Sequence, residues 1–283
     1  MTKIVEVKGI KIGGGNPIAV IAGPCVVENY EITYQTAKRA KEITTELGMP
    51  FIFKSSYKKA NRTSLKGFST IGEKLALEIL AQIRKELDIP VLTDIHSEPE
   101  AEMAAEYVDV LQIPAFLCRQ TELLIAAGRT GKAVNIKKGQ FMAPEDMKYA
   151  AEKVASTGNE KILLTERGTT FGYHNLVVDM RSIPIMRSTG YPVVIDATHS
   201  LQLPSVGEKS GGRPEFIFHI ARAAVAVGVD AIFLETHPEP SKALSDSASQ
   251  LKLDFLYELL YQVKQIDELV KKFDEFTINQ DVR

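Results

Sequence analysis

The sequence predicts an α/β protein that folds as a single (β/α)8 TIM barrel preceded by a short β-hairpin. Three observations lead to this expectation. Eight short runs rich in Val, Ile, Leu or Phe recur at fairly even spacing along the 283 residues. Segments with helical periodicity separate most of these runs. The length also suits a barrel of roughly 250 residues with little chain left over.

The predicted strands are mostly continuous apolar runs, as expected for parallel strands that are covered on both faces. Pro or Gly borders many of them and favours a turn at that point. In chain order the predicted strands are 18–23, 50–55, 90–95, 108–113, 133–137, 161–167, 192–197 and 230–235.

The connecting segments contain the predicted helices. Helical periodicity is clearest in 30–47, 72–87 and 213–228. The connection between the third and fourth strands leaves only 97–108 for a helix, which is enough for about three turns. An amphipathic closing helix follows from Leu251.

The two ends of the chain complete the predicted domain. Residues 3–12, with a central Lys-Gly, indicate a hairpin that covers the bottom of the barrel. We therefore expect one domain over 1–283. Its parts are the hairpin in 1–13, the barrel in 18–265 and a C-terminal tail in 266–283.

The composition is that of an ordinary soluble globular protein, with 45% hydrophobic and 25% charged residues. A net charge of −2 argues against a nucleic-acid or membrane partner. Two cysteines, Cys25 and Cys118, cannot build a disulfide framework, which favours reduced thiols and a cytoplasmic protein. The N-terminus has no signal-peptide pattern, and no stretch reaches the roughly 18 apolar residues of a membrane helix.

The residues that end the predicted strands carry the functional signal. Active sites of such barrels lie at the carboxyl ends of the strands. Ordinary turn residues would offer few reactive side chains, whereas these positions are rich in titratable groups and in residues that can bind a metal. They are Cys25, Lys54, Asp94 with His96, Gln112, Lys137, Arg167, Asp196 with His199, and Glu235.

Cations gather at the same end of the barrel. A nearly neutral protein that places many positive charges around one opening is expected to bind a strongly anionic ligand, such as two phosphates or a phosphate and a carboxylate. The alternative for any one lysine is an ordinary solvated loop residue. The Gly-rich segment 205–213 could form a mobile lid or an anion-binding nest, but a plain flexible loop is the simpler interpretation. The cations are Lys54, Lys59, Arg62, Arg119, Lys137, Lys138 and Arg167.

A second group of residues suits a divalent metal. Cys25, His199, Glu235 and Asp246 follow the first, seventh and eighth predicted strands, which are neighbours in a closed barrel. A thiolate, an imidazole and two carboxylates can hold one transition metal. Taken singly, each has a simpler explanation, such as a buried structural cysteine or a helix cap. Their joint placement favours a metal site.

The residues at the strand ends resemble one known family. The motifs FKSSYKKANRTS (53–64), TDIH (93–96), QIPAFLCRQT (112–121), KKGQF (137–141), ERGTTFGYHNLVVDMRS (166–182), DATHS (196–200) and ETHPEPSKALSD (235–246) are similar to those of 3-deoxy-D-manno-octulosonate 8-phosphate (KDO8P) synthases. The resemblance runs from about residue 17 to residue 265. It implies condensation of phosphoenolpyruvate with D-arabinose 5-phosphate and water. The products would be the Kdo precursor of lipopolysaccharide and inorganic phosphate.

The resemblance also assigns roles to residues. It implies that the phosphoenolpyruvate site consists of Lys54, Lys59, Lys137, Gln140 and Arg167. It implies that arabinose 5-phosphate is held by Asn61, Arg62 and Thr63, with Arg119 reaching its phosphate from a neighbouring subunit of a homotetramer. Asp94 and Gln112 are further substrate-binding candidates. The residues expected to take part in the chemistry are Lys54, Lys59, Asn61, Lys137, His199 and Asp246.

One position divides this family, because members with asparagine at the place of Cys25 work without metal and members with cysteine require a divalent cation. The resemblance therefore places this chain in the metal-dependent class, with Cys25, His199, Glu235 and Asp246 as ligands of Fe²⁺, Zn²⁺, Mn²⁺ or Co²⁺. The segment LKGFSTIG (65–72) departs from the family pattern, which leaves the details of that loop open.

Three other functions stay open from the sequence. The related 3-deoxy-D-arabino-heptulosonate 7-phosphate (DAHP) synthase uses erythrose 4-phosphate, but its loop after the second strand reads K-P-R-T-S where this chain has K-A-N-R-T-S. A non-catalytic barrel that binds sugar phosphates is a second alternative, although both the cations and the metal ligands are intact. A metal-dependent hydrolase or aldolase rests on fold alone.

Overall fold

Eight parallel strands form a closed ring in the computed structural model, which describes residues 1–62, 64–65, 67–204 and 211–273. The ring runs in the order β11–β8–β7–β6–β5–β4–β3–β14, and β11 also pairs with β14. Its strands are β3 (Ala19–Gly23), β4 (Phe51–Lys54), β5 (Val91–Asp94), β6 (Val110–Ile113), β7 (Ala133–Lys137), β8 (Ile162–Glu166), β11 (Val193–Asp196) and β14 (Ala231–His237). Each overlaps a predicted strand, and the (β/α)8 barrel is confirmed.

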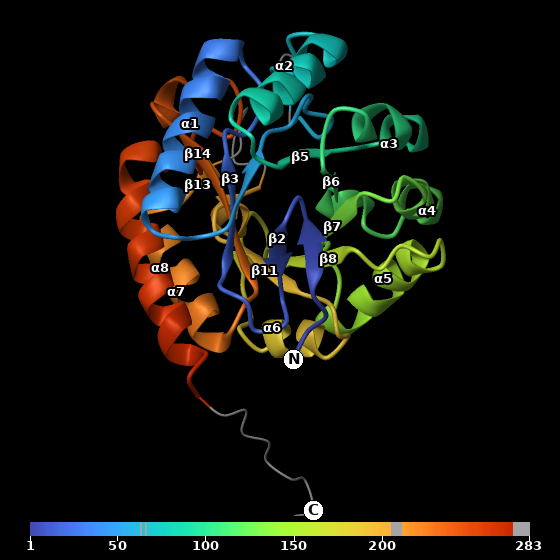
Figure 1. The fold of residues 1–283 in the computed structure, drawn as a ribbon, viewed down its shortest axis with the longest axis vertical. Coiled ribbons are helices and arrows are strands. Elements are labelled where there is room, and N and C mark those ends of the chain that lie inside the picture. The colour runs from blue at the N-terminus through green and yellow to red at the C-terminus, as the bar shows by residue number, and fades with distance from the viewer. Residues whose placement is uncertain (63, 66, 205–210, 274–283) are drawn as a thin grey trace, which may run out of the picture.

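One α-helix follows each barrel strand, and together the helices form an outer layer around the ring (Figure 1). They are α1 (Tyr30–Glu46), α2 (Glu73–Glu86), α3 (Glu98–Ala105), α4 (Thr121–Arg129), α5 (Met147–Ala155), α6 (Ser182–Arg187), α7 (Ile217–Val227) and α8 (Leu256–Val270). Helix α3 is about one turn shorter than its segment allowed. Helix α8 extends into the region assigned to the tail, whose residues 274–283 lie outside the described part of the chain.

Local signals in the sequence explain where several helices begin and end. Helix α1 begins after Asn29, whose side chain accepts a hydrogen bond from the Ile32 amide at 2.9 Å. Helix α7 ends at Gly228, which has a left-handed φ of 100° that glycine adopts without strain. The buried faces of the helices pack on the outside of the barrel and form the larger hydrophobic core.

The N-terminal hairpin closes the bottom of the barrel, as predicted. Strands β1 (Val5–Val7) and β2 (Ile10–Ile12) are antiparallel, and the Lys8–Gly9 turn between them has positive φ at both residues. The buried residues of the hairpin join a second core made by the first residues of the barrel strands. This core contains Val5, Val7, Ile12, Ala19, Ile21, Ile52, Leu92, Val110, Ala133, Leu163, Val194, Ala231 and Phe233.

Short strands and 3₁₀ helices lie in the loops that follow the barrel strands. The short strands are β9 (Thr169–Thr170), β10 (Leu176–Val177), β12 (Gln202–Leu203), β13 (Gly211–Gly212) and β15 (Leu251–Lys252). The 3₁₀ helices are Ala115–Leu117, Pro144–Asp146, His199–Leu201, Pro214–Phe216, Pro240–Lys242 and Leu253–Phe255. Among the described residues, no helix has the length and apolar character needed to cross a membrane.

Candidate active site

A cavity of 520 Å³ opens at the carboxyl ends of the barrel strands. This is the end of the barrel where such folds carry their active sites, because the strand ends and the loops behind them converge there. Most of the predicted site residues contribute to its wall. They are Lys54, Lys59, Asn61, Arg62, Asp94, Gln112, Lys137, Gln140, Arg167, His199, Glu235 and Asp246.

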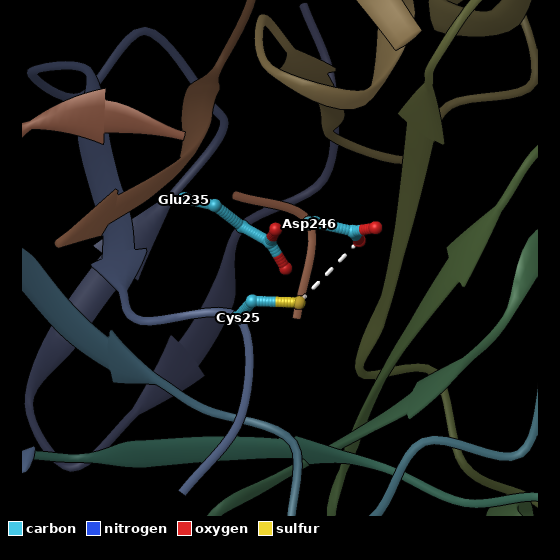
Figure 2. Close-up of side chains that lie close together, drawn as sticks. All are labelled: Cys25, Glu235 and Asp246. Atoms are coloured by element: carbon cyan, nitrogen blue, oxygen red, sulfur yellow. Dashed lines mark hydrogen bonds between the residues drawn. The ribbon is translucent and has the colours of Figure 1, made fainter. Parts of the chain in front are cut away.

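Cys25, Glu235 and Asp246 form a cluster beside the cavity (Figure 2). One ligand atom from each lies within 4.8 Å of the others, and the Cys25 thiol donates to Asp246 Oδ2 at 3.4 Å. Cys25 follows the first barrel strand, β3. Glu235 belongs to the last, β14, and Asp246 lies in the loop after it. Closure of the ring between β3 and β14 therefore brings these three side chains together.

His199, the fourth predicted ligand, lies next to this group of three but is not a member of it. Its Nε2 lies 3.3 Å from Glu235 Oε1 and 3.8 Å from Asp246 Oδ2. Its Nδ1 lies 2.7 Å from Asp196 Oδ2, so the ring is held with Nε2 directed at the two carboxylates. A carboxylate on the far nitrogen is the usual support of a metal-binding histidine. The sequence analysis counted Asp196 among the strand-end residues but gave it no role, and the structure places it as the support of the His199 ring.

The cluster fits a divalent transition metal. Glu235 Oε2 is buried and makes no hydrogen bond within the described residues, so it is a free acceptor inside the protein. Cys25, His199, Glu235 and Asp246 also offer the mixture of sulfur, nitrogen and oxygen that such ions accept.

The end of β3 places Cys25 at this point. A side chain at Gly23 would collide with the backbone carbonyl of Lys54 on β4, so glycine allows the two strands to lie close together. The Cys25 amide donates to Gln250 Oε1 at 3.2 Å, and its carbonyl accepts from Lys54 Nζ at 3.1 Å. The thiol is buried, and burial followed by the carboxylates of Asp246 and Glu235 raises its pKa well above the usual range. A bound cation would offset both causes.

Lys54 and Lys59 stand next to the cluster. Lys54 Nζ donates to Glu235 Oε1 at 2.5 Å, and Lys59 Nζ lies 4.0 Å from the same oxygen. Burial by itself raises the pKa of Glu235, but His199, Lys54 and Lys59 hold it well below its usual range. Glu235 is therefore ionised. Both lysines also line the cavity, so they connect it to the Cys25–Glu235–Asp246 group.

Lys137 and Arg167 supply positive charge deep in the cavity. Lys137 Nζ pairs with Asp196 Oδ2 at 2.6 Å and lies 3.7 Å from the centre of the Phe233 ring. Burial lowers the pKa of both Lys137 and Arg167, and carboxylates nearby oppose that effect. Both cations are almost completely enclosed, so an anion that enters the cavity meets little competing water.

Several polar atoms of the cavity wall are buried and have no hydrogen-bond partner among the described residues. They are Asp94 Oδ1, Gln140 Oε1, Arg167 Nη1 and Glu235 Oε2. Buried polar groups are nearly always paired, so such a group of unpaired atoms in one wall indicates a polar ligand. Gln112 differs, because its Oε1 accepts from Asn135 Nδ2 at 3.0 Å inside the barrel.

Some predicted site residues are placed elsewhere. Arg119 is exposed and is not part of the cavity wall of its own chain. Lys138 was expected among the cations at the opening, and this is wrong. It is fully buried, with Nζ 2.9 Å from Thr169 Oγ1 and 3.4 Å from Glu166 Oε1, because it points behind the strand ends. Thr63 and most of the 205–213 loop lie outside the described residues.

This fold, with a basic cavity and a cluster of potential metal ligands at the carboxyl ends of its strands, defines a (β/α)8-barrel enzyme that acts on an anionic substrate. The model of the DAHP synthetase I family matches residues 1–272, and the chain belongs to this family. The resemblance to KDO8P synthases, which the motifs indicated, is confirmed by relatives that align over nearly the whole chain.

Three relatives illustrate the similarity. Proteins from Geobacter sp. (strain M21), Geotalea uraniireducens and Syntrophotalea carbinolica are 56%, 55% and 53% identical to it. Each alignment covers 96% of this chain and 98–100% of the relative. All three relatives are named 2-dehydro-3-deoxyphosphooctonate aldolase.

Proposed function

We propose that the protein condenses phosphoenolpyruvate with D-arabinose 5-phosphate and water to give KDO8P and inorganic phosphate. One observation carries the proposal. The cations expected for phosphoenolpyruvate, the Asn61–Arg62 pair expected for the sugar phosphate, and the cluster of metal ligands all meet at one cavity. The names of the relatives support the same product class, because each refers to an eight-carbon sugar acid phosphate.

DAHP synthase is the closest alternative, since the family description carries its name. Two findings favour the eight-carbon product. The loop after β4 contains Asn61 in the sequence K-A-N-R-T-S, and Asn61 faces the cavity, where it can bind a hydroxyl of a longer sugar. The relatives at 53–56% identity are also named for the octonate rather than for a heptulosonate.

The cations of the cavity perform the first task of this reaction. Phosphoenolpyruvate must approach a second phosphorylated molecule, and Lys54, Lys59, Lys137 and Arg167 offset the repulsion between them. They also hold carbon 3 of the enol against the aldehyde carbon, which turns an encounter of two molecules into a positioned reaction. A carbon–carbon bond then forms, one water adds at carbon 2, and the C–O bond to phosphate breaks. Lys137 and Arg167, being buried, keep the departing phosphate paired.

We propose that a divalent cation is held by Cys25, His199, Glu235 and Asp246, with Fe²⁺, Zn²⁺, Mn²⁺ and Co²⁺ as the candidates. When bound, such an ion polarises an oxygen or lowers the pKa of a water. The chain contributes the orientation, because Asp196 fixes the His199 ring and Lys54 fixes one oxygen of Glu235. Asp246 and His199 lie on the cavity side and are placed to carry protons to and from the reacting oxygens.

We further propose a homotetramer that acts in the cytoplasm, with Arg119 binding the sugar phosphate of a neighbouring subunit. The support is local. Arg119 follows the 3₁₀ helix Ala115–Leu117, whose Phe116 is 59% exposed at the edge of the cavity. An exposed aromatic side chain next to an exposed cation at the opening of a site suits burial against a second copy.

Parallel assays test the proposed reaction. Purified protein with its metal is mixed with phosphoenolpyruvate and either arabinose 5-phosphate or erythrose 4-phosphate, and released phosphate and sugar acid are measured together. We expect one phosphate for each eight-carbon product with arabinose 5-phosphate. Turnover with erythrose 4-phosphate alone would establish the DAHP synthase alternative. Tight binding of both substrates without phosphate release would establish the non-catalytic one.

A further inference from the structure

Glu100 on α3 collects hydrogen bonds from two loops of the active-site face, although it does not line the cavity. Its Oε2 accepts from the backbone amide of His96 at 2.9 Å, lies 3.0 Å from His96 Nδ1, and accepts from the Tyr57 hydroxyl. Its Oε1 accepts from Lys58 Nζ at 2.8 Å and from Ser97 Oγ at 3.0 Å. One carboxylate therefore joins the loop after β4 to the loop after β5.

Part of this arrangement is ordinary helix capping. Glu100 is the third residue of α3, and a glutamate there commonly bonds backwards to the residues before the helix. Capping explains the bonds to His96 N and Ser97. It does not explain the bonds from Tyr57 and Lys58, which come from 43 and 42 positions away in the chain. Tyr57 is fully buried, so its hydroxyl depends on Glu100 for a partner.

The contact to the β4 loop acts on the predicted sugar-phosphate residues. Tyr57 and Lys58 immediately precede Lys59, and Asn61 and Arg62 follow in the wall of the cavity. A loop fixed at Tyr57 and Lys58 presents the next residues in one arrangement, because few backbone torsions separate them.

The contact to the β5 loop acts on Asp94. His96 Nε2 lies 3.2 Å from Asp94 Oδ2, while Asp94 Oδ1 is buried at the cavity and has no partner in the described parts of the chain. Burial disfavours the charged form of His96 and so lowers its pKa. Hydrogen bonds and charge from Asp94 and Glu100 outweigh this effect and raise the pKa to about 9. It therefore stays protonated at neutral pH and holds one oxygen of Asp94, leaving the other to accept from a substrate hydroxyl.

We propose that Glu100 is a positioning residue that sets the sugar-phosphate half of the cavity and so controls affinity for the sugar phosphate rather than for phosphoenolpyruvate. This inference rests on the proposed function. The cations assigned to phosphoenolpyruvate have other supports. Lys59 follows Lys58 directly in the β4 loop, but its Nζ lies 3.4 Å from Ser56 Oγ and 4.0 Å from Glu235 Oε1, and Lys54 also pairs with Glu235. Lys137 is fixed by Asp196, and Arg167 Nη2 donates to Gln202 at 3.0 Å, both on the opposite side of the ring.

Steady-state kinetics of the metal-loaded enzyme test the inference. For Glu100→Gln and Glu100→Ala, we expect the KM for arabinose 5-phosphate to rise about tenfold and about a hundredfold, with the KM for phosphoenolpyruvate within twofold of wild type. Glu98→Gln is the matched control, because Glu98 is an exposed glutamate in the same helical turn. It should leave both values unchanged.

The outcomes separate the possible roles of Glu100. Equal rises in both KM values, or no rise in either, would overturn the inference and leave Glu100 as a cap of α3. Tyr57→Phe and Lys58→Met each remove one donor to Glu100, so they give the same test should Glu100→Ala unfold. For these two we expect a smaller rise, about threefold, again confined to the sugar phosphate. Wild-type enzyme that does not turn over arabinose 5-phosphate would instead overturn the proposed function.

Discussion

The two ends of the barrel are built on opposite principles. At the bottom, Val5, Val7 and Ile12 of the hairpin pack on the apolar first residues of the strands. At the top, the same strands end in buried charges such as Lys137 and Arg167, and several polar atoms lack partners among the described residues. The lower end therefore stabilises the fold. The upper end contains buried charges and unpaired polar atoms that do not stabilise it.

The two ends contribute to the free energy of folding with opposite sign. Apolar burial at the bottom contributes about 25 cal/mol for each Å² removed from water. Buried ions at the top cost several kcal/mol each unless they are paired, and pairs such as Lys137–Asp196 recover only part of that cost. Substitutions at the top are therefore expected to change activity, and substitutions at the bottom are expected to change stability.

Removal of the metal should have the largest effect on the upper end. We expect exhaustive chelation to reduce kcat by about a thousandfold or more, because the site would lose the ion proposed to polarise an oxygen or to lower the pKa of a water. Addition of one divalent transition metal should restore it, and circular dichroism should show the barrel intact throughout. Cys25→Asn is expected to turn over without metal. Full activity after chelation would contradict the metal site while leaving the reaction in place.

Replacement of Arg167 should separate activity from stability. Arg167 is buried and has one donor group without a partner in the described chain. For Arg167→Met we expect kcat/KM to fall by about 10²–10³-fold, with the free energy of unfolding unchanged or higher by about 1 kcal/mol. Urea unfolding and phosphate-release assays measure the two quantities. The exposed Arg129→Met is the control, and a large loss of stability in Arg167→Met would contradict the comparison.

Truncation of Ile12 should give the opposite result. Ile12 is fully buried in the lower core, so Ile12→Ala is expected to lower the free energy of unfolding by about 2–5 kcal/mol. Both KM values and kcat of the remaining folded protein should stay at the wild-type level. Ile4→Ala, at a side chain that is 56% exposed in the same N-terminal segment, should have little effect. A specific loss of activity in Ile12→Ala would show that the two ends are coupled.

The smallest effect expected is a pH dependence of stability from His96. Its pKa is raised to about 9 from an ordinary value of 6.5, a shift that corresponds to ~3 kcal/mol or less. A raised pKa means that the folded state binds the proton more tightly. The stabilisation is therefore complete below about pH 6.5 and is lost as the pH rises through about 9. The difference in unfolding free energy between wild type and His96→Gln should shrink over this window, and a constant difference would contradict the assignment.

The barrel was predictable because its signals are local. Continuous apolar runs bordered by Pro or Gly identified all eight strands, and Lys8–Gly9 identified the hairpin turn. Lengths were less well predicted. Helix α3 stops at Ala105 within a segment that ran to residue 108, because helix ends depend on packing against neighbouring strands as well as on sequence.

The site was predictable only in outline. The proximity of Cys25 and Glu235 followed from barrel closure, because the first and last strands of a closed barrel must be neighbours. Which direction a side chain points was not predictable, and Lys138 turned away from the cavity. The bond between Tyr57 and Glu100 was also missed. Residues of these types are common on exposed surfaces, and nothing in their spacing indicates a contact between distant loops.

The pairing of β3 with β14 has a consequence for protein synthesis. Cys25 leaves the ribosome early, whereas Asp246 follows it by 221 positions. A nascent chain can therefore offer only an isolated thiol during most of translation, and the complete set of donors arises in the last stage of production. Chains that terminate before Glu235 would lack two of the four donors proposed for the cation.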